Sequence, residues 1–114
     1  MTQLTITAPD DWHLHFRDGE MLNETVPATA RCFKRAIVMP NLALPVTNKK
    51  QALAYRQRIL ESLPSNSDFN PLMTLYLTNE TSGQDIKDAV SKEIPAAKLY
   101  PAGATTNSSA AVKA

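Results

Sequence analysis

The chain has 114 residues, of which 43% are hydrophobic and 20% are charged, and its formal net charge is +1. These values are typical of one globular domain with a real core, and the length is too short for two domains. The dispersed charges give no reason to expect a nucleic acid or a membrane as partner. Because no apolar run approaches membrane-spanning length and the N-terminus has no signal-peptide pattern, we expect a cytoplasmic protein. The single cysteine, Cys32, excludes an intrachain disulfide and a cysteine-rich zinc site.

The first third of the chain predicts strands around a helix. Residues 5–8 and 12–16 are expected to be extended, and a helix is expected across residues 21–33. Pro27 fits that helix only near its start or at a break. Residues 35–40 are rich in apolar side chains and end in proline, which suits a fully buried strand.

The clearest helical pattern covers residues 48–63. Thr47 or Asn48 can cap its start, and Pro64 follows its end. The expected buried stripe consists of Leu53, Tyr55, Ile59, Leu60 and Leu63.

The remaining pattern predicts strand, helix and strand again. Residues 71–77 and 96–100 are the expected strands, and Thr81 or Ser82 can cap the helix between them. The expected buried residues of this segment are Ile86, Ala89, Val90 and Ile94.

Strict alternation of this kind predicts an α/β fold with parallel strands and right-handed helical crossovers. A doubly wound open sheet and a (β/α)8 barrel both satisfy the pattern. No glycine-rich phosphate loop is present, which weakens the nucleotide-binding version of the open sheet. In a barrel the chemistry lies at the carboxyl ends of the strands, where His15, Arg17 and Asn41 fall.

His13 and His15 are the only histidines in the chain, and Arg17 follows two residues later. On a strand these three side chains would project from one face, while Leu14 and Phe16 pack on the other. Two neutral imidazoles can bind a zinc-class ion, and a guanidinium beside them can hold a carboxylate. The alternative is a pair of partly buried histidines satisfied by hydrogen bonds.

Lys98 lies within an otherwise apolar strand. A buried lysine must lower its pKa, find an anionic partner or change chemically. The alternative is a side chain that reaches past the end of the strand to solvent. A neutral lysine amine beside metal ions can instead react with carbon dioxide, and the resulting carbamate can bridge two metals.

The sequence resembles the bacterial single-function dihydroorotases of the amidohydrolase superfamily nearly continuously from residue 10 to residue 109. The segments that carry the resemblance are residues 13–19 (HLHFRDG), 38–46 (VMPNLALPV), 55–60 (YRQRIL), 71–74 (PLMT), 97–101 (AKLYP) and 104–109 (ATTNSS).

This resemblance implies a site with two zinc ions. His13 and His15 would bind the more buried zinc, and a carboxylated Lys98 would bridge the pair as a catalytic group. Arg17 and Asn41 would hold the carboxylate of the substrate, with the arginine offering a planar bidentate fork.

Thr105 and Thr106 lie on a segment that, in the family, closes over the substrate and donates hydroxyl hydrogen bonds. Gly103 would help this segment to move. The alternative for both threonines is an ordinary flexible loop.

The resemblance also implies an activity. It is the zinc-dependent, reversible cyclisation of N-carbamoyl-L-aspartate to L-dihydroorotate in de novo pyrimidine (UMP) biosynthesis, with a small-molecule substrate and a homodimer when full-length. Hydantoinases and allantoinases share the histidine pair and the lysine. The Arg17 and Asn41 pair, with the loop that follows Gly103, favours dihydroorotase.

The chain departs from the family pattern, which requires two further histidines and a late aspartate as general base. Only four strands are expected, whereas a full barrel takes roughly 250 residues. We therefore expect residues 1–114 to be the N-terminal half of a single amidohydrolase barrel domain, without an internal boundary and inactive alone. The alternative is a complete, non-catalytic half-barrel that acts as an assembly partner.

Overall fold

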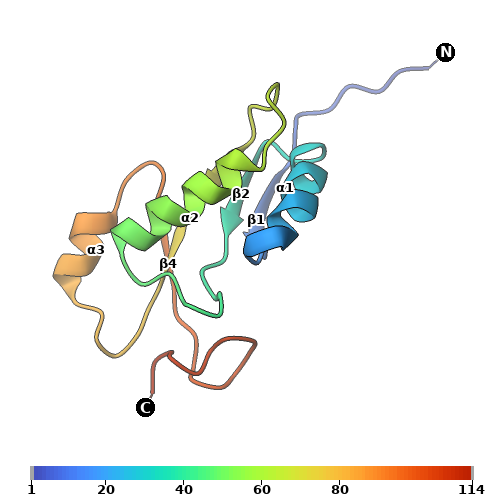
Figure 1. Cartoon of the computed structure of the whole chain (residues 1–114). Coiled ribbons are helices and arrows are strands. Elements are labelled where there is room, and N and C mark those ends of the chain that lie inside the picture. The colour runs from blue at the N-terminus through green and yellow to red at the C-terminus, as the bar shows by residue number, and fades with distance from the viewer. Residues whose placement is uncertain (1, 114) are drawn as a thin grey trace.

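Strands and helices alternate along the chain in this computed structural model, which describes residues 2–113 (Figure 1). The elements in chain order are β1 (Asp10–Leu14), the short 3-10 helix η1 (Gly19–Met21), α1 (Leu22–Ala30), β2 (Arg35–Val38), α2 (Lys49–Glu61), β3 (Asn70–Leu72), β4 (Thr74–Tyr76), α3 (Gly83–Ala89) and β5 (Ala96–Lys98).

All the described strand pairs are parallel, which confirms the predicted α/β class. One sheet has the order β1-β2-β3, and a second pairs β4 with β5. The single strand predicted over residues 71–77 is therefore divided. Between its two parts, the Met73 N–H donates to the Glu93 carbonyl at 2.7 Å, so the segment changes partner from β2 to β5 at this residue.

Two predictions in the N-terminal part were wrong. Residues 5–8 lie in no described strand and are exposed, because they extend beyond the end of β1 and find no strand to pair with. Pro27 lies inside α1 rather than at its start or at a break. The carbonyl that would have accepted its missing N–H belongs to Asn23, which is exposed, so water can replace the lost bond.

The predicted start of α2 is confirmed, because the Asn48 side chain accepts the Gln51 N–H at 2.9 Å. Two predicted core residues are nevertheless exposed: Leu53 by 39% and Val90 by 64%. The buried stripe of α2 centres on Tyr55 and Ile59, and Leu53 lies at its solvent edge. Val90 follows the last residue of α3, where the backbone has left the helical conformation.

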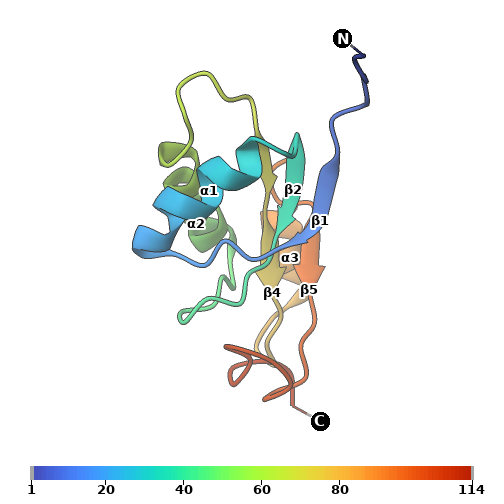
Figure 2. The same ribbon diagram turned by 90° about the vertical axis from the view of Figure 1, so that its right-hand side faces the viewer.

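The strand over residues 35–38 alternates between buried and more exposed residues instead of being buried on both faces. Ala36 and Val38 pack into the core beneath the helices, whereas Ile37 points to the opposite side and is only partly covered. The covered side is called the outer face below, and the opposite side is called the inner face. Figure 2 shows α1 and α2 together on one side of the strands.

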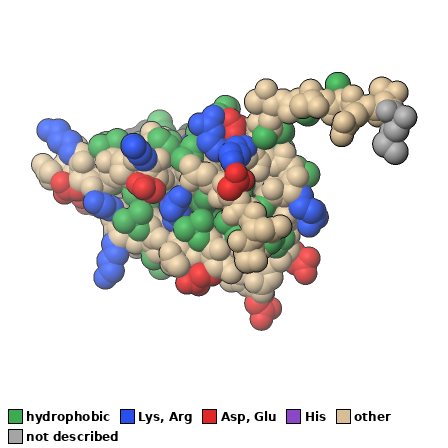
Figure 3. All heavy atoms as spheres, turned by 90° about the horizontal axis from the view of Figure 1, so that it is seen from above, with side chains coloured by type: hydrophobic (Ala, Val, Ile, Leu, Met, Phe, Trp, Pro, Cys, Tyr) green, Lys and Arg blue, Asp and Glu red, His purple; other side chains and the backbone are tan. Residues whose placement is uncertain are grey.

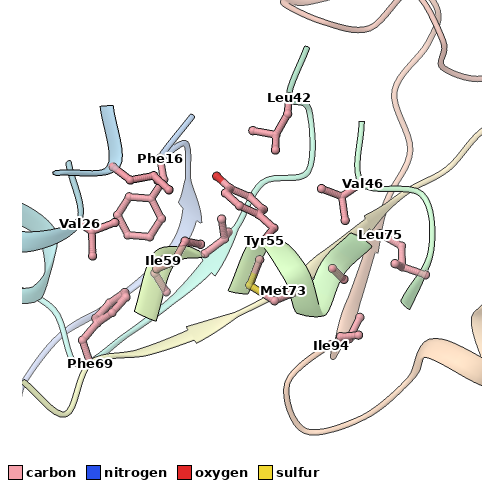
Figure 4. Close-up of a cluster of buried hydrophobic side chains, with 14 of the residues drawn as sticks. Phe16, Val26, Leu42, Val46, Tyr55, Ile59, Phe69, Met73, Leu75 and Ile94 are labelled. Atoms are coloured by element: carbon pink, nitrogen blue, oxygen red, sulfur yellow. The ribbon is translucent and has the colours of Figure 1, made fainter. Parts of the chain in front are cut away.

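A continuous apolar cluster fills the space between the outer face and the helices (Figure 4). Its buried members are Phe16, Leu22, Val26, Ala36, Val38, Leu42, Val46, Ala52, Tyr55, Ile59, Phe69, Met73, Leu75, Ala89 and Ile94. Burial of these side chains is the main favourable term available to the fold.

Acidic and basic side chains are interspersed on the surface seen in Figure 3. None of the helices described within residues 2–113 is long and apolar enough to cross a membrane.

Candidate metal and carboxylate site

The candidate site residues lie on the strands β1, β2 and β5 or just past their carboxyl ends. His13 lies on β1, and His15 follows it by two residues. Leu14 and Phe16 pack with the outer-face cluster, so the two histidines are directed to the inner face. Asn41 follows β2, and Lys98 is the last residue of β5.

The two imidazoles converge, as their predicted position on one face requires. The Nε2 atoms of His13 and His15 are 3.2 Å apart. A tetrahedral zinc ion with Zn–N bonds of 2.0 to 2.1 Å separates two nitrogen ligands by about 3.3 to 3.4 Å. The pair therefore fits the bite of such an ion. Within residues 2–113 no group of three or more His, Cys, Asp or Glu side chains gathers as a metal cage.

The surroundings of His15 favour its neutral form. Partial burial lowers the pKa of His15, and the positive charges of Arg17, His13 and Lys98 act in the same direction. The nearby Asn41 amide opposes the shift. Because only the neutral imidazole binds a metal, the lowered pKa keeps this ligand available at neutral pH.

Arg17 does not continue the strand, contrary to the simple alternation argument. Its φ of 61° is in the left-handed region, which is unusual for a residue other than glycine. The Nη1 atom of its guanidinium is buried and finds no hydrogen-bond partner among the described residues. A buried charged donor without an acceptor is costly, so this group suits an anionic ligand.

Asn41 is only 2% exposed and is already tied to the C-terminal segment. Its Nδ2 donates to the Thr106 carbonyl at 2.9 Å, and its Oδ1 accepts the Tyr100 hydroxyl at 3.1 Å. Its backbone carbonyl accepts the Asn107 amide at 3.2 Å. An amide nitrogen carries two hydrogens, so one hydrogen remains for a ligand.

Lys98 is partly buried, and its Nζ lies 5.9 Å from the centroid of the Tyr100 ring. This distance suits a cation–π contact. Its charge also contributes to the lowered pKa of His15, so the amine is within electrostatic reach of the histidine pair.

Known proteins resemble this chain closely in sequence. No family model matches the chain. Relatives called dihydroorotase are 71% identical in Shewanella frigidimarina over all 114 residues, 68% identical in Pseudoalteromonas atlantica over 99% of the chain, and 62% identical in a Marinomonas species over 98% of it. Over nearly its whole length the chain is similar to proteins called dihydroorotase. It spans 33% of the length of each of these relatives.

Solved structures of dihydroorotases give the same result. The crystal structure of the Campylobacter jejuni dihydroorotase matches 96% of this chain with a TM-score of 0.83 and 40% identity. The Saccharomyces cerevisiae dihydroorotase in complex with 5-fluoroorotic acid matches 91% with a TM-score of 0.81 and 33% identity. The chain covers 33% and 28% of those two proteins, respectively.

In this chain the loop after β5 folds back across the strand ends (Figure 1). Thr105 and Thr106 are exposed, and the Ser108 hydroxyl bonds to the Thr105 N–H at 2.9 Å and to its carbonyl at 2.6 Å. Gly103 has a φ of +78°, which a residue with a Cβ rarely adopts.

The tyrosines of this region were not among the site residues predicted from the sequence. The Tyr100 hydroxyl bonds to Asn41, and the Tyr76 hydroxyl donates to the Asn107 carbonyl at 3.0 Å. Burial raises the pKa of both phenols, so they remain donors at neutral pH. The sequence signal that could have identified Tyr76 and Tyr100 is their position at the ends of two neighbouring strands.

Proposed function

We propose that this chain forms part of a dihydroorotase, whose reaction is the zinc-dependent, reversible cyclisation of N-carbamoyl-L-aspartate to L-dihydroorotate. The observation that carries the proposal is the convergent histidine pair, with 3.2 Å between its Nε2 atoms, beside an Arg17 guanidinium whose buried Nη1 atom has no hydrogen-bond partner among the described residues. One part is suited to a metal ion and the other to a carboxylate. The high identity to proteins called dihydroorotase supports the same reading.

The parallel strands fit a portion of a (β/α)8 barrel. In this interpretation β3 and β4 are one barrel strand, so residues 1–114 supply four strands and three helices of a single domain. The inner face would then line the barrel, with its candidate residues at the carboxyl end, where barrel enzymes place their chemistry. A cytoplasmic location and a homodimer of the whole protein belong to the same proposal.

His13 and His15 would hold a zinc ion, and Lys98 would become a bridging ligand after carboxylation. Bound zinc would polarise a carbonyl and lower the pKa of water. The task of Arg17 is to orient the substrate, because its guanidinium fork can donate hydrogen bonds to both carboxylate oxygens. Asn41 would add its remaining amide hydrogen to the same carboxylate.

The loop that carries Thr105 and Thr106 would cover the bound substrate and limit the access of water. Its attachment to Asn41 supports this role, because the residue that would bind the carboxylate also bonds to the Thr106 carbonyl. Substrate binding and loop position would then depend on each other.

Zinc binding by the purified chain tests the metal assignment. Isothermal titration with Zn²⁺ should show binding that is lost in His15→Ala, because one of two imidazole ligands is removed. Cys32→Ala is the matched control, since Cys32 is an exposed thiol that could bind zinc adventitiously. Loss of binding in Cys32→Ala, with binding kept in His15→Ala, would reject the assignment.

The reaction itself is tested in a full-length protein that contains this sequence. Turnover of L-dihydroorotate should exceed turnover of hydantoin or allantoin, because only dihydroorotate offers a carboxylate to Arg17. Preferred turnover of a ring without a carboxylate would assign the protein to another cyclic amidohydrolase.

A further inference from the structure

The turn that carries Arg17 is held from the opposite face of the sheet by the helix α2. The left-handed conformation of Arg17 costs of order 1–3 kcal/mol, so its surroundings must favour it. Two side chains of α2, Tyr55 and Arg58, contact the residues 17 and 18 of this turn.

Tyr55 crosses the apolar core to reach the turn. Its side chain rises from α2 among the outer-face cluster, with the hydroxyl oxygen at the end away from the helix (Figure 4). Only 1% of the residue is exposed, and the hydroxyl donates to the Arg17 carbonyl at 2.5 Å. Burial raises the pKa of this phenol, and the nearby Asp18 charge raises it further, so the hydroxyl stays protonated.

Arg58 holds the next residue with a bidentate ion pair. Its Nε and Nη2 atoms donate to the two carboxylate oxygens of Asp18 at 3.0 and 2.9 Å. Its guanidinium also lies over the Tyr55 ring, 5.3 Å from the centroid. The Asp18 carboxylate in turn accepts the Gly19 N–H at 2.9 Å and caps η1.

Stability alone does not explain the pair of Arg58 and Asp18. The side chains of Arg58 and Asp18 are 44% and 37% exposed, and ion pairs of that exposure contribute little to the free energy of unfolding. The pair instead fixes the position of Asp18, the residue next to Arg17.

We propose that Tyr55 and Arg58 are positioning residues, which keep the Arg17 turn in the conformation that presents its guanidinium to a carboxylate. The inference rests on the proposed function, because that function supplies the carboxylate. The proposal extends substrate recognition to α2, on the far side of the sheet. Tyr55 and Arg58 of this helix act on the substrate only through the turn that carries Arg17.

Tyr55→Phe removes the hydroxyl and keeps the ring in the core. In a full-length protein that contains this sequence, the KM for L-dihydroorotate should rise about tenfold while kcat changes little, because one hydrogen bond is lost. In an Arg17→Lys background the same change should have almost no further effect, since the two residues act as one unit. An equal loss of kcat/KM in both backgrounds would overturn the proposal.

Arg58→Lys should raise KM in the same way, because an ammonium cannot make the bidentate contact. Arg35→Lys is the matched control: Arg35 makes the same type of pair with Asp10 at the other end of β1, at 3.1 and 2.6 Å. Equal effects of these two variants on KM would show that the pairs are only structural.

A measurement on the 114-residue chain separates this inference from the proposed function. In Tyr55→Phe the carbonyl carbon of Arg17 should shift upfield in NMR spectra, and its Cα shift should move away from left-handed values. Unchanged shifts would refute the positioning role even if the enzyme is a dihydroorotase. If the shifts change but dihydroorotate is not turned over, the proposed function fails. The positioning of the Arg17 turn by Tyr55 would still hold.

Discussion

The two faces of the same strands differ in how completely their side chains find packing or hydrogen-bond partners. The outer face packs under α1 and α2 through a continuous apolar cluster. The inner face carries His13, His15 and Lys98, and the buried Arg17 Nη1 and Thr74 Oγ1 atoms lack partners among the described residues. Apolar packing and polar groups without partners therefore lie on opposite sides of one layer of strands, and the Tyr55 side chain connects the two sides.

The largest expected effect comes from opening a cavity on the outer face. Ile59 is fully buried, so Ile59→Ala should lower the free energy of unfolding by about 2–5 kcal/mol, measured by urea denaturation. The matched control is Leu53→Ala on the same helix, which should change it by about 0.5 kcal/mol or less because Leu53 is 39% exposed. Equal losses in the two variants would contradict the assignment of the outer face.

A substitution on the inner face should have the opposite effect: it should weaken substrate binding and leave the free energy of unfolding nearly unchanged. Arg17→Met keeps much of the side-chain volume and removes an unpaired buried donor, so the free energy of unfolding should stay within about 0.5 kcal/mol or increase. Substrate binding by a full-length protein should weaken by about 1.5–3 kcal/mol, which is roughly 10- to 150-fold in KM.

Calorimetry and steady-state kinetics on the same variant test this contrast. A loss of more than about 2 kcal/mol in unfolding free energy, with KM unchanged, would place Arg17 among the structural residues. Trp12→Phe serves as a control, because Trp12 is a half-exposed residue of β1 that stacks with Arg35 away from the histidine pair.

The parts of the molecule that depend on neighbouring residues could be predicted from the sequence. The Asn48 cap uses a residue three positions away, and the shared direction of His13 and His15 follows from strand geometry. The burial of Leu53 and Val90 was predicted wrongly because periodicity does not fix which edge of a helix meets solvent or where the helix ends.

The long-range contacts that hold the candidate site residues in place could not be predicted in the same way. Tyr55 and Arg17 are 38 residues apart, and Asn41 and Thr106 are 65 apart. A contact over such a separation depends on how strands and helices pack together, which one sequence does not encode in any local pattern. The left-handed turn at Arg17 belongs to this group, since only tertiary contacts offset its backbone strain.

The smallest expected effect concerns α3, at the edge of the outer face. Ser82 and Asp85 form a capping box in which the Ser82 hydroxyl accepts the Asp85 N–H at 3.1 Å. Ser82→Ala should lower the free energy of unfolding by about 1 kcal/mol at neutral pH. The control Ser65→Ala, in an exposed loop, should leave the free energy of unfolding unchanged. Zinc binding should be the same in both variants.

This last effect should also depend on pH. Hydrogen bonds from the Ser82 backbone N–H and then from its hydroxyl lower the pKa of Asp85 below its ordinary value of 3.8. The carboxylate therefore stabilises the folded chain fully above that value, and the contribution is lost as the pH falls through the lower, folded-state pKa. The difference between wild type and Ser82→Ala in urea denaturation should shrink over that acidic range. A difference that stays constant down to pH 2 would show that the bond between the Ser82 hydroxyl and the Asp85 carboxylate contributes nothing to the stability of the cap.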